Sequence, residues 1–189
     1  MLHALDVNSD VSAGMLASLS NLSEEARGWL DPAVNVRGFL DTLRRESLFA
    51  DAVSVLTHVL PRQYAIAWGC ECWQDAHAGA EPDPSERSAL AAAQRWLKDP
   101  TEENRTAAQE LAERLGHRTS AALLAAAAGW GGGSMLPPGQ PEVPPPPTLS
   151  GAAVSAAVIL TAAETPASYE ARMGTFVDRA LVAFASATH

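Results

Sequence analysis

The sequence predicts an all-α fold, an irregular bundle of about eight to nine helices with one long proline-rich segment. Three observations support this prediction. Apolar residues recur at the three- and four-residue spacing of helices, and capping residues precede several of the periodic segments. In addition, 37 of the 189 residues are alanine, the residue with the highest helix propensity. No segment alternates as a strand, and no dipeptide is typical of a hairpin turn.

Asp-Pro pairs mark three predicted helix starts, at Asp31, Asp83 and Asp99. An aspartate at the N-cap accepts hydrogen bonds from free backbone N–H groups, and a proline at the first helical position has no N–H to leave unpaired. A glutamate follows three residues after Asp83 and after Asp99, which completes a capping-box pattern. Asn21 and Thr165 give weaker signals of the same kind.

Hydrophobic periodicity agrees with these capping signals, and together they predict nine helices, of which the last has the broadest apolar face. The predicted helices are 22–30, 33–45, 48–60, 62–79, 84–98, 101–116, 119–129, 149–163 and 166–187. Three of them, starting at residues 84, 101 and 119, are spaced like helical hairpin repeats. Repeats require matching residues at a fixed period, and none are found, so an irregular bundle is favoured over a short solenoid.

The length of the chain fits one domain. We expect residues 1–20 to form a mobile arm and residues 21–189 to form a single helical domain that contains a proline-rich loop at 131–148. Between Arg118 and Glu164 the only charged residue is Glu142. Glycines and seven prolines interrupt this stretch, so it cannot supply the roughly 20 apolar helical residues of a membrane span. We therefore expect its helices, 119–129 and 149–163, to form the core, with 149–163 surrounded by neighbours.

The charge of the chain excludes several classes of partner. With 13 Lys and Arg against 22 Asp and Glu, the net charge is -9, and the chain has no basic surface for nucleic acid or an anionic membrane. The first ten residues contain no Lys or Arg, unlike a secretory signal. We expect a cytoplasmic protein whose partner is another protein, while the oligomeric state stays open.

The densest group of reactive side chains includes Glu71, Asp75 and His77. Two carboxylates one helical turn apart can perform acid–base chemistry when their environments separate their pKa values. The alternative, which we favour, is that both carboxylates face solvent near an arginine.

Cys70 and Cys72 lie two residues apart on a predicted helix and point about 200° apart around its axis. This geometry excludes an internal disulfide and joint metal binding by the pair. We interpret both as reduced, buried core residues.

No GxSxG, Walker, HExxH or dinucleotide-binding motif occurs. The sequence therefore assigns no catalytic, cofactor-binding or metal-binding residue, and we expect a protein that is not an enzyme and has no cofactor.

The proline-rich loop is the most informative segment, because a loop this long is usually functional or a linker. Its prolines could dock in an aromatic groove of a partner, or they could pack internally on Trp130 or Trp73 and strap the helices together. We favour the strap. The residues that would act in either role are Trp130, Met135, Leu136, Pro137, Pro138, Pro144, Pro145, Pro146 and Pro147.

Three stretches carry a resemblance to a known family. They are LPRQYAIAWGCECW, DPTEENRTAA and GGGSMLPPGQPEVPPPP, within residues 35–185. Together they resemble an uncharacterised bacterial family of about 200 residues with an SLxPP-like motif, which Ser134–Pro138 matches with Met135 inserted or substituted. Members are often encoded near type VI secretion genes, so the resemblance implies an accessory role in secretion. The resemblance implies no catalytic residue in this chain, because none is established for the family.

These observations favour a non-enzymatic interaction protein, an adaptor, chaperone or assembly factor accessory to type VI secretion. Two alternatives stay open. An immunity or regulatory protein could use the acidic surface to neutralise a basic toxin or effector, and an enzyme could use Glu71, Asp75 and His77 in a cleft.

Overall fold

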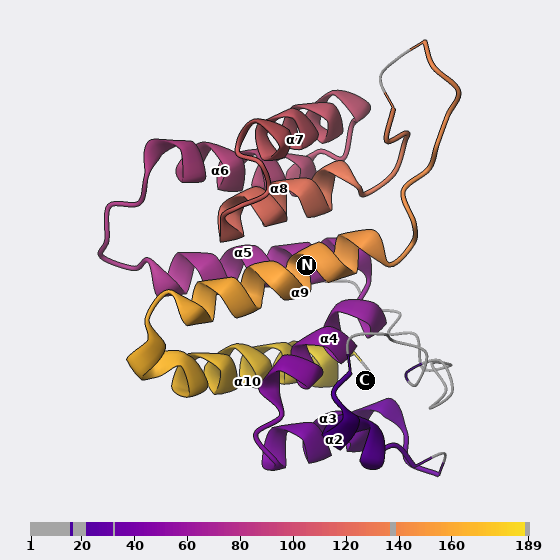
Figure 1. Cartoon of the computed structure of the whole chain (residues 1–189), viewed down its shortest axis with the longest axis vertical. Coiled ribbons are helices and arrows are strands. Elements are labelled where there is room, and N and C mark those ends of the chain that lie inside the picture. Colours follow the sequence, from indigo (N-terminus) through magenta and orange to yellow (C-terminus); the bar gives the residue numbers. More distant parts are fainter. Residues whose placement is uncertain (1–15, 17–21, 32, 137–138, 188–189) are drawn as a thin grey trace. The chain divides into compact units, whose positions relative to one another are not determined.

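The computed structural model describes residue 16 and residues 22–31, 33–136 and 139–187, the last five of these through their backbone only. Within these residues the fold is all-α, as the sequence predicts, with nine α-helices, one short 3-10 helix and no strand (Figure 1). The elements are α2 (Glu24–Gly28), α3 (Val36–Arg45), α4 (Phe49–Val59), α5 (Arg62–Ala76), α6 (Pro84–Lys98), α7 (Glu102–Arg114), α8 (Ser120–Gly129), α9 (Leu149–Ala163), η1 (Pro166–Ser168) and α10 (Tyr169–Ala187).

The described residues group into two compact units. The first contains residues up to Pro61 and those from Ala162 onward, and the second spans Arg62–Thr161. The single domain expected over 21–189 stays a prediction. The expected N-terminal arm lies outside the described residues except for Leu16, which is buried.

In the first unit, α4 contacts α3 and α10. A buried carboxylate attaches α2 to α4: Asp51 accepts hydrogen bonds from the Ser23 backbone N (2.7 Å) and hydroxyl (3.0 Å). Ser23 is itself the N-cap of α2 and accepts from the Ala26 N–H. On the surface, Arg44 of α3 donates to both carboxylate oxygens of Asp178 on α10.

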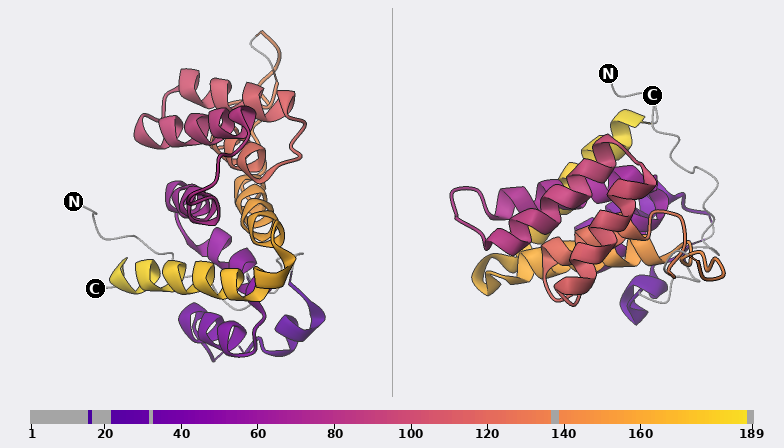
Figure 2. Two further views of the ribbon diagram at one scale, coloured as in Figure 1. Left: turned by 90° about the vertical axis from the view of Figure 1, so that its left-hand side faces the viewer. Right: turned by 90° about the horizontal axis from the view of Figure 1, so that it is seen from above.

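In the second unit, α6, α7 and α8 pack against one another in all three pairings, and α5 contacts α6 and α8. The three helices lie together in both directions of view (Figure 2). A linear stack of repeats, in which each repeat contacts only its neighbours, does not describe this triangle of mutual contacts. The arrangement is therefore an irregular cluster.

The core of the second unit is built on small residues. In α8 every residue except Leu123 is buried, as the charge-free composition predicts. Gly69 lets α5 approach its neighbours, because a Cβ there would lie 2.6 Å from Leu124 of α8 and 3.2 Å from Val154 of α9. The expectation that α9 is surrounded on every side is wrong: Ala156 and Leu160, four residues apart on one face, are exposed.

The structure corrects two of the three helix starts predicted from Asp-Pro pairs. Asp83 caps α6 as expected, accepting from the Ser85 N–H. Asp99 does not cap α7, because it already ends α6 by donating its own N–H to the Arg95 carbonyl; Thr101 is the N-cap instead. Asp31 closes a turn by accepting from the Ala33 N–H, and α3 begins five residues later behind Asn35.

Among the described residues, no single helix is long and apolar enough to cross a membrane. The two successive segments Leu149–Ala163 and Pro166–Val182 reach the necessary length and hydropathy only when they are taken together across the break between them.

Candidate functional site

The proline-rich loop (residues 131–148) connects α8 to α9 and projects from the helices of the second unit (Figure 1). Two of the glycines that begin the loop, Gly131 and Gly133, lie against other side chains, whereas a Cβ at Gly132 would meet nothing within 4 Å. A Cβ at Gly131 would lie 2.6 Å from the Trp96 ring. Gly133 has a positive φ of 61°, and a Cβ there would lie 2.7 Å from Arg105 Nε. α8 ends at Gly129 with Trp130 as its C-cap, and Gly131 and Gly133 permit the close packing beyond it.

Two arginines hold the start of this loop. Arg62, the first residue of α5, donates to the Gly131 carbonyl. Arg105 of α7 is buried, with 7% of its surface exposed, and its Nη1 donates to the Gly129 carbonyl at 2.6 Å. These carbonyls stand at the C-terminal end of α8, where backbone acceptors lack intrahelical donors. Each arginine therefore satisfies an acceptor and fixes the direction in which the loop leaves α8.

Arg105 is fixed in turn by its neighbours along α7. Its Nε and Nη2 donate to the two oxygens of Glu102 at 2.7 Å and 2.5 Å, and its Nη1 also donates to Gln109 Oε1 at 2.9 Å. Gln109 then donates to Glu113 at 3.1 Å. The hydrogen bond from Arg105 lowers the pKa of Glu102 and raises the pKa of Arg105 itself. The guanidinium is thus neutralised and directed into the fold.

The hydroxyl of Ser134 closes the loop on itself. It accepts hydrogen bonds from the backbone N–H groups of Leu136 (3.0 Å) and Val143 (3.1 Å). One residue further on, the Met135 N–H donates to the Val143 carbonyl at 2.8 Å. Residues 134–143 therefore have the closed ends of an Ω-loop. At the returning end of the loop, the Ser150 hydroxyl of α9 donates to the Ala127 carbonyl of α8.

The closed loop exposes apolar side chains. Met135, Leu136 and Val143 are 37%, 38% and 44% exposed. In the proline run, Pro144, Pro146 and Pro147 are exposed and Pro145 is half-buried. Pro137 and Pro138 lie outside the described residues.

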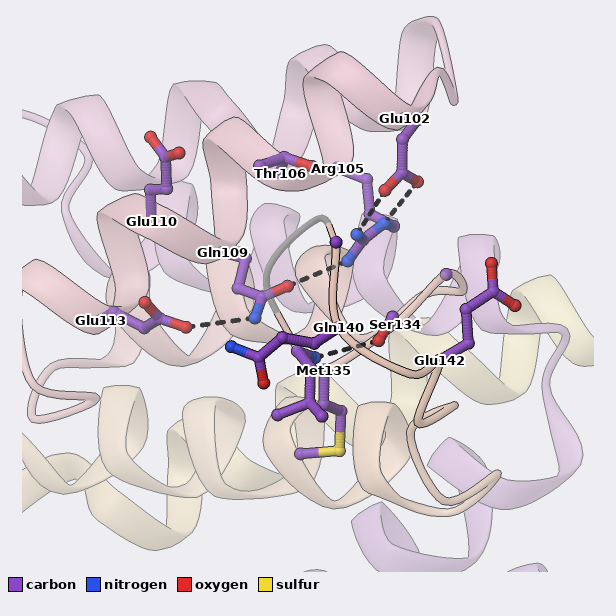
Figure 3. Close-up of a pocket in the computed structure, with 13 residues that line it drawn as sticks. Glu102, Arg105, Thr106, Gln109, Glu110, Glu113, Ser134, Met135, Gln140 and Glu142 are labelled. Atoms are coloured by element: carbon purple, nitrogen blue, oxygen red, sulfur yellow. Dashed lines mark hydrogen bonds and ion pairs between the residues drawn. The ribbon is translucent and has the colours of Figure 1, made fainter.

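A groove of about 610 Å³ separates this loop from α7. We call it the α7 groove. Figure 3 shows Glu102, Arg105, Gln109 and Glu113 in a row along the helix, with Ser134, Met135, Gln140 and Glu142 coming from the loop. Its lining is complete with Thr106, Glu110, Gly133, Leu136 and Gly139. Arg105 is the one basic residue in this lining, against four glutamates.

The two indoles considered as partners of an internal strap each stack on a histidine. The Trp130 ring lies 5.4 Å from that of His117, and the buried Trp73 ring lies 4.0 Å from that of His77. Three of the four prolines in Pro144–Pro147 meanwhile face solvent. Whether this run straps the helices or binds a partner stays a prediction.

The polar residues of α5 lie away from the lining of the α7 groove. Glu71 and Asp75 are exposed. His77, just after the helix, is half-buried, and its Nδ1 lies 2.8 Å from the Trp73 carbonyl oxygen. Cys70 and Cys72 are buried thiols with no disulfide between them, as expected, and burial raises the pKa of the Cys70 thiol to about 12. Within the part of the chain that is described, no three His, Cys, Asp or Glu side chains gather as metal ligands would.

Met135 and Leu136 are among the residues that the sequence predicts for this site, whereas Arg62, Arg105 and Ser134, which position the loop, are not. The spacing of Glu102, Arg105 and Gln109 at i, i+3 and i+7 was a readable signal of a polar row on one helix face. Nothing in the local sequence indicates that this row meets the end of α8, because the Arg105–Gly129 contact joins residues 24 apart. The arrangement offers recognition surfaces, apolar on the loop and acidic in the groove.

The chain matches no curated protein and no solved structure. A family model does match it, over residues 39–184, which is well over half of its length. The matched region includes α4–α9 and the proline-rich loop in full. The chain therefore belongs to a family of unknown function (DUF6931).

Proposed function

We propose that this protein is a non-enzymatic interaction protein, an adaptor, chaperone or assembly factor, that binds a protein partner through its proline-rich loop. One observation carries the proposal. The loop is fixed at its base by Arg62 and Arg105 and closed by Ser134, yet it leaves Met135, Leu136 and Val143 exposed. The hydrogen bonds that Ser134 accepts hold residues 134–143 as a closed loop and not as an extended linker.

A loop held in one conformation loses little conformational entropy on binding, so more of the contact energy becomes affinity. Prolines add to this effect because their φ angles are already restricted. Exposed methionine suits a protein-binding surface, since its flexible thioether adapts to irregular partners. The solvent-facing prolines Pro144, Pro146 and Pro147 favour a partner over an internal strap.

The resemblance of Ser134–Pro138 and the flanking stretches to a family often encoded near type VI secretion genes supports a secretion component as the partner. The protein would then act in the cytoplasm of a bacterium. The exposure of Glu71 and Asp75, the carboxylates considered for acid–base chemistry, favours a non-enzymatic role.

Site-specific photo-crosslinking in the native host tests the proposal. A photoreactive residue at Val143, in the loop, is compared with one at Val182, on α10, which is 68% exposed. We expect the Val143 variant, and not the Val182 variant, to crosslink a type VI secretion component in stoichiometric amount. No crosslinked partner at Val143, together with only a loss of stability when Pro144–Pro147 are replaced by alanine, would contradict the proposal and support the strap.

A second candidate function is an immunity or regulatory protein for a basic toxin or effector. The observation in its favour is the excess of glutamates along the α7 groove. Co-expression with an effector encoded nearby separates the two functions. Rescue of cells from that effector is expected of an immunity protein and not of an adaptor.

A further inference from the structure

We infer that the α7 groove binds an extended segment of a partner protein that carries arginine or lysine beside apolar residues. This inference rests on the proposed function and names the chemistry of the segment that is recognised. It follows from the charge of the groove, the fixed position of its one arginine, and the apolar side chains on its loop side.

The groove has an uncompensated negative charge. Its lining contains Glu102, Glu110, Glu113 and Glu142 against Arg105 alone. Arg105 forms a two-bond pair with Glu102, so these two charges cancel. Three carboxylates remain on exposed residues of the lining, and Figure 3 shows Glu113 on the helix side and Glu142 on the loop side.

Arg105 cannot move to neutralise them without a cost. It is buried and also donates to Gln109 and to the Gly129 carbonyl. Turning the guanidinium toward Glu113 or Glu142 would leave that carbonyl without its donor, which is unfavourable for a buried backbone group. The glutamates are therefore available to a positively charged group from outside.

The loop supplies the second kind of contact. Met135 and Leu136 line the groove and are more than one-third exposed. A purely ionic ligand would leave these side chains in water, whereas a segment with both basic and apolar side chains would cover them. Nucleic acid and other polyanions are excluded by the same glutamates. A volume of about 610 Å³ is within the usual range of binding clefts, roughly 300–1,000 Å³.

A peptide-binding assay tests the inference on the full chain. The probe is a fluorescein-labelled peptide of three Arg-Leu repeats, with three Glu-Leu repeats and three Arg-Ser repeats as comparators, measured by fluorescence anisotropy. We expect the Arg-Leu peptide to bind most tightly and the Glu-Leu peptide not to bind. Raising the salt concentration should weaken binding, because exposed ion pairs are screened.

Two double variants separate the groove from the general acidity of the chain. Glu113→Gln with Glu142→Gln removes two charges from the groove, and the Gln109 hydrogen bond can persist because glutamine also accepts one. Glu71→Gln with Glu81→Gln is the matched control, since both residues are exposed, lie in the same unit and do not line the groove. We expect the groove variant to weaken binding about fivefold, as the loss of two solvent-exposed ion pairs predicts, and the control to bind as the wild type does.

An equal loss in both variants would overturn the inference, because binding would then reflect net charge alone. Equal affinity for the Arg-Leu and Arg-Ser peptides would also overturn it, since the apolar side would contribute nothing. Displacement of the labelled Arg-Leu peptide by spermidine as effectively as by unlabelled Arg-Leu peptide would overturn it for the same reason. If Val143 crosslinks a partner while no Arg-Leu peptide binds, the inference is wrong and the proposed function stands. If the peptide binds in the groove but no partner crosslinks at Val143, the proposed role of the loop is wrong.

Discussion

Gly129 provides a sharp test of the packing that fixes the loop. It is the last residue of α8, and a Cβ there would lie 2.7 Å from Gln109 Cβ and 2.9 Å from Gln109 Cα on α7. The second contact is with backbone, so no side-chain rotation can relieve it. Replacing Gly129 by alanine must therefore separate α7 from α8 locally, beside the Gly129 carbonyl that Arg105 holds.

The expected free-energy change is the balance of two opposing effects. Overpacking in a close-packed interior costs about 1–3 kcal/mol, while alanine improves helix propensity by at most about 1 kcal/mol over glycine. We therefore expect Gly129→Ala to lower the free energy of unfolding by about 1–2 kcal/mol. For a protein of this length that corresponds to a fall in Tm of roughly 2–8 °C.

Gly28 is the matched control. It is also the last residue of its helix, α2, it also lacks a positive φ, and a Cβ there would meet nothing within 4 Å. With no contact to oppose the reduced entropy of the unfolded chain, Gly28→Ala should stabilise the protein by about 0.4–1 kcal/mol. The two substitutions are chemically identical, so opposite signs would isolate the packing contribution.

Urea unfolding measures both variants. Tryptophan fluorescence reports mainly on the second unit, which holds four of the five tryptophans, and far-UV circular dichroism reports on both units. A Gly129→Ala variant as stable as the wild type, or more stable, would refute the close approach of α7 and α8. The base of the loop would then not be fixed by this packing.

Three further predictions concern other residues. Arg105→Met should lower the free energy of unfolding by about 1–3 kcal/mol, because the Gly129 carbonyl loses a buried donor, and hydrogen exchange should show faster amide exchange in residues 133–143. Cys70, with its pKa raised to about 12 by burial, should not react with iodoacetamide at pH 8 until the chain unfolds. The hydrogen bond from Arg44 lowers the pKa of Asp178 below its ordinary value of 3.8. This ion pair therefore stabilises the fold above pH 3.8, and that stabilisation is lost as the pH falls through the lowered pKa. Asp178→Asn should remove this pH dependence from acid-unfolding curves.

The helices could be predicted because their signals are local. Capping residues, hydrophobic periodicity and alanine content together located every α-helix of the described residues, and Asp83 capped α6 as its sequence indicates. The errors at Asp31 and Asp99 have a physical reason as well. Each aspartate had a second local use, a turn in one case and the end of the preceding helix in the other, and a capping pattern does not reveal which use is realised.

The candidate site was predicted only in part, for a different reason. The length and prolines of the loop mark it as unusual, and Met135 and Leu136 could be identified as candidates. The groove beside it could not be predicted, because its two walls, α7 and the loop, are separated along the chain by α8. Its acidity depends on which glutamates of α7 face the loop and on Arg105 being neutralised by Glu102.

The sequence by itself determined the all-α class, the positions of the helices, the burial of α8 and the absence of a recognisable catalytic motif. These follow from interactions between residues three or four apart and from composition. The tertiary structure decided why Gly129, Gly131 and Gly133 are glycines, where Arg105 donates its hydrogen bonds, and which face of α9 is exposed. Each of these depends on residues far apart in the chain reaching contact distance, as Arg62 and Gly131 do across 69 positions.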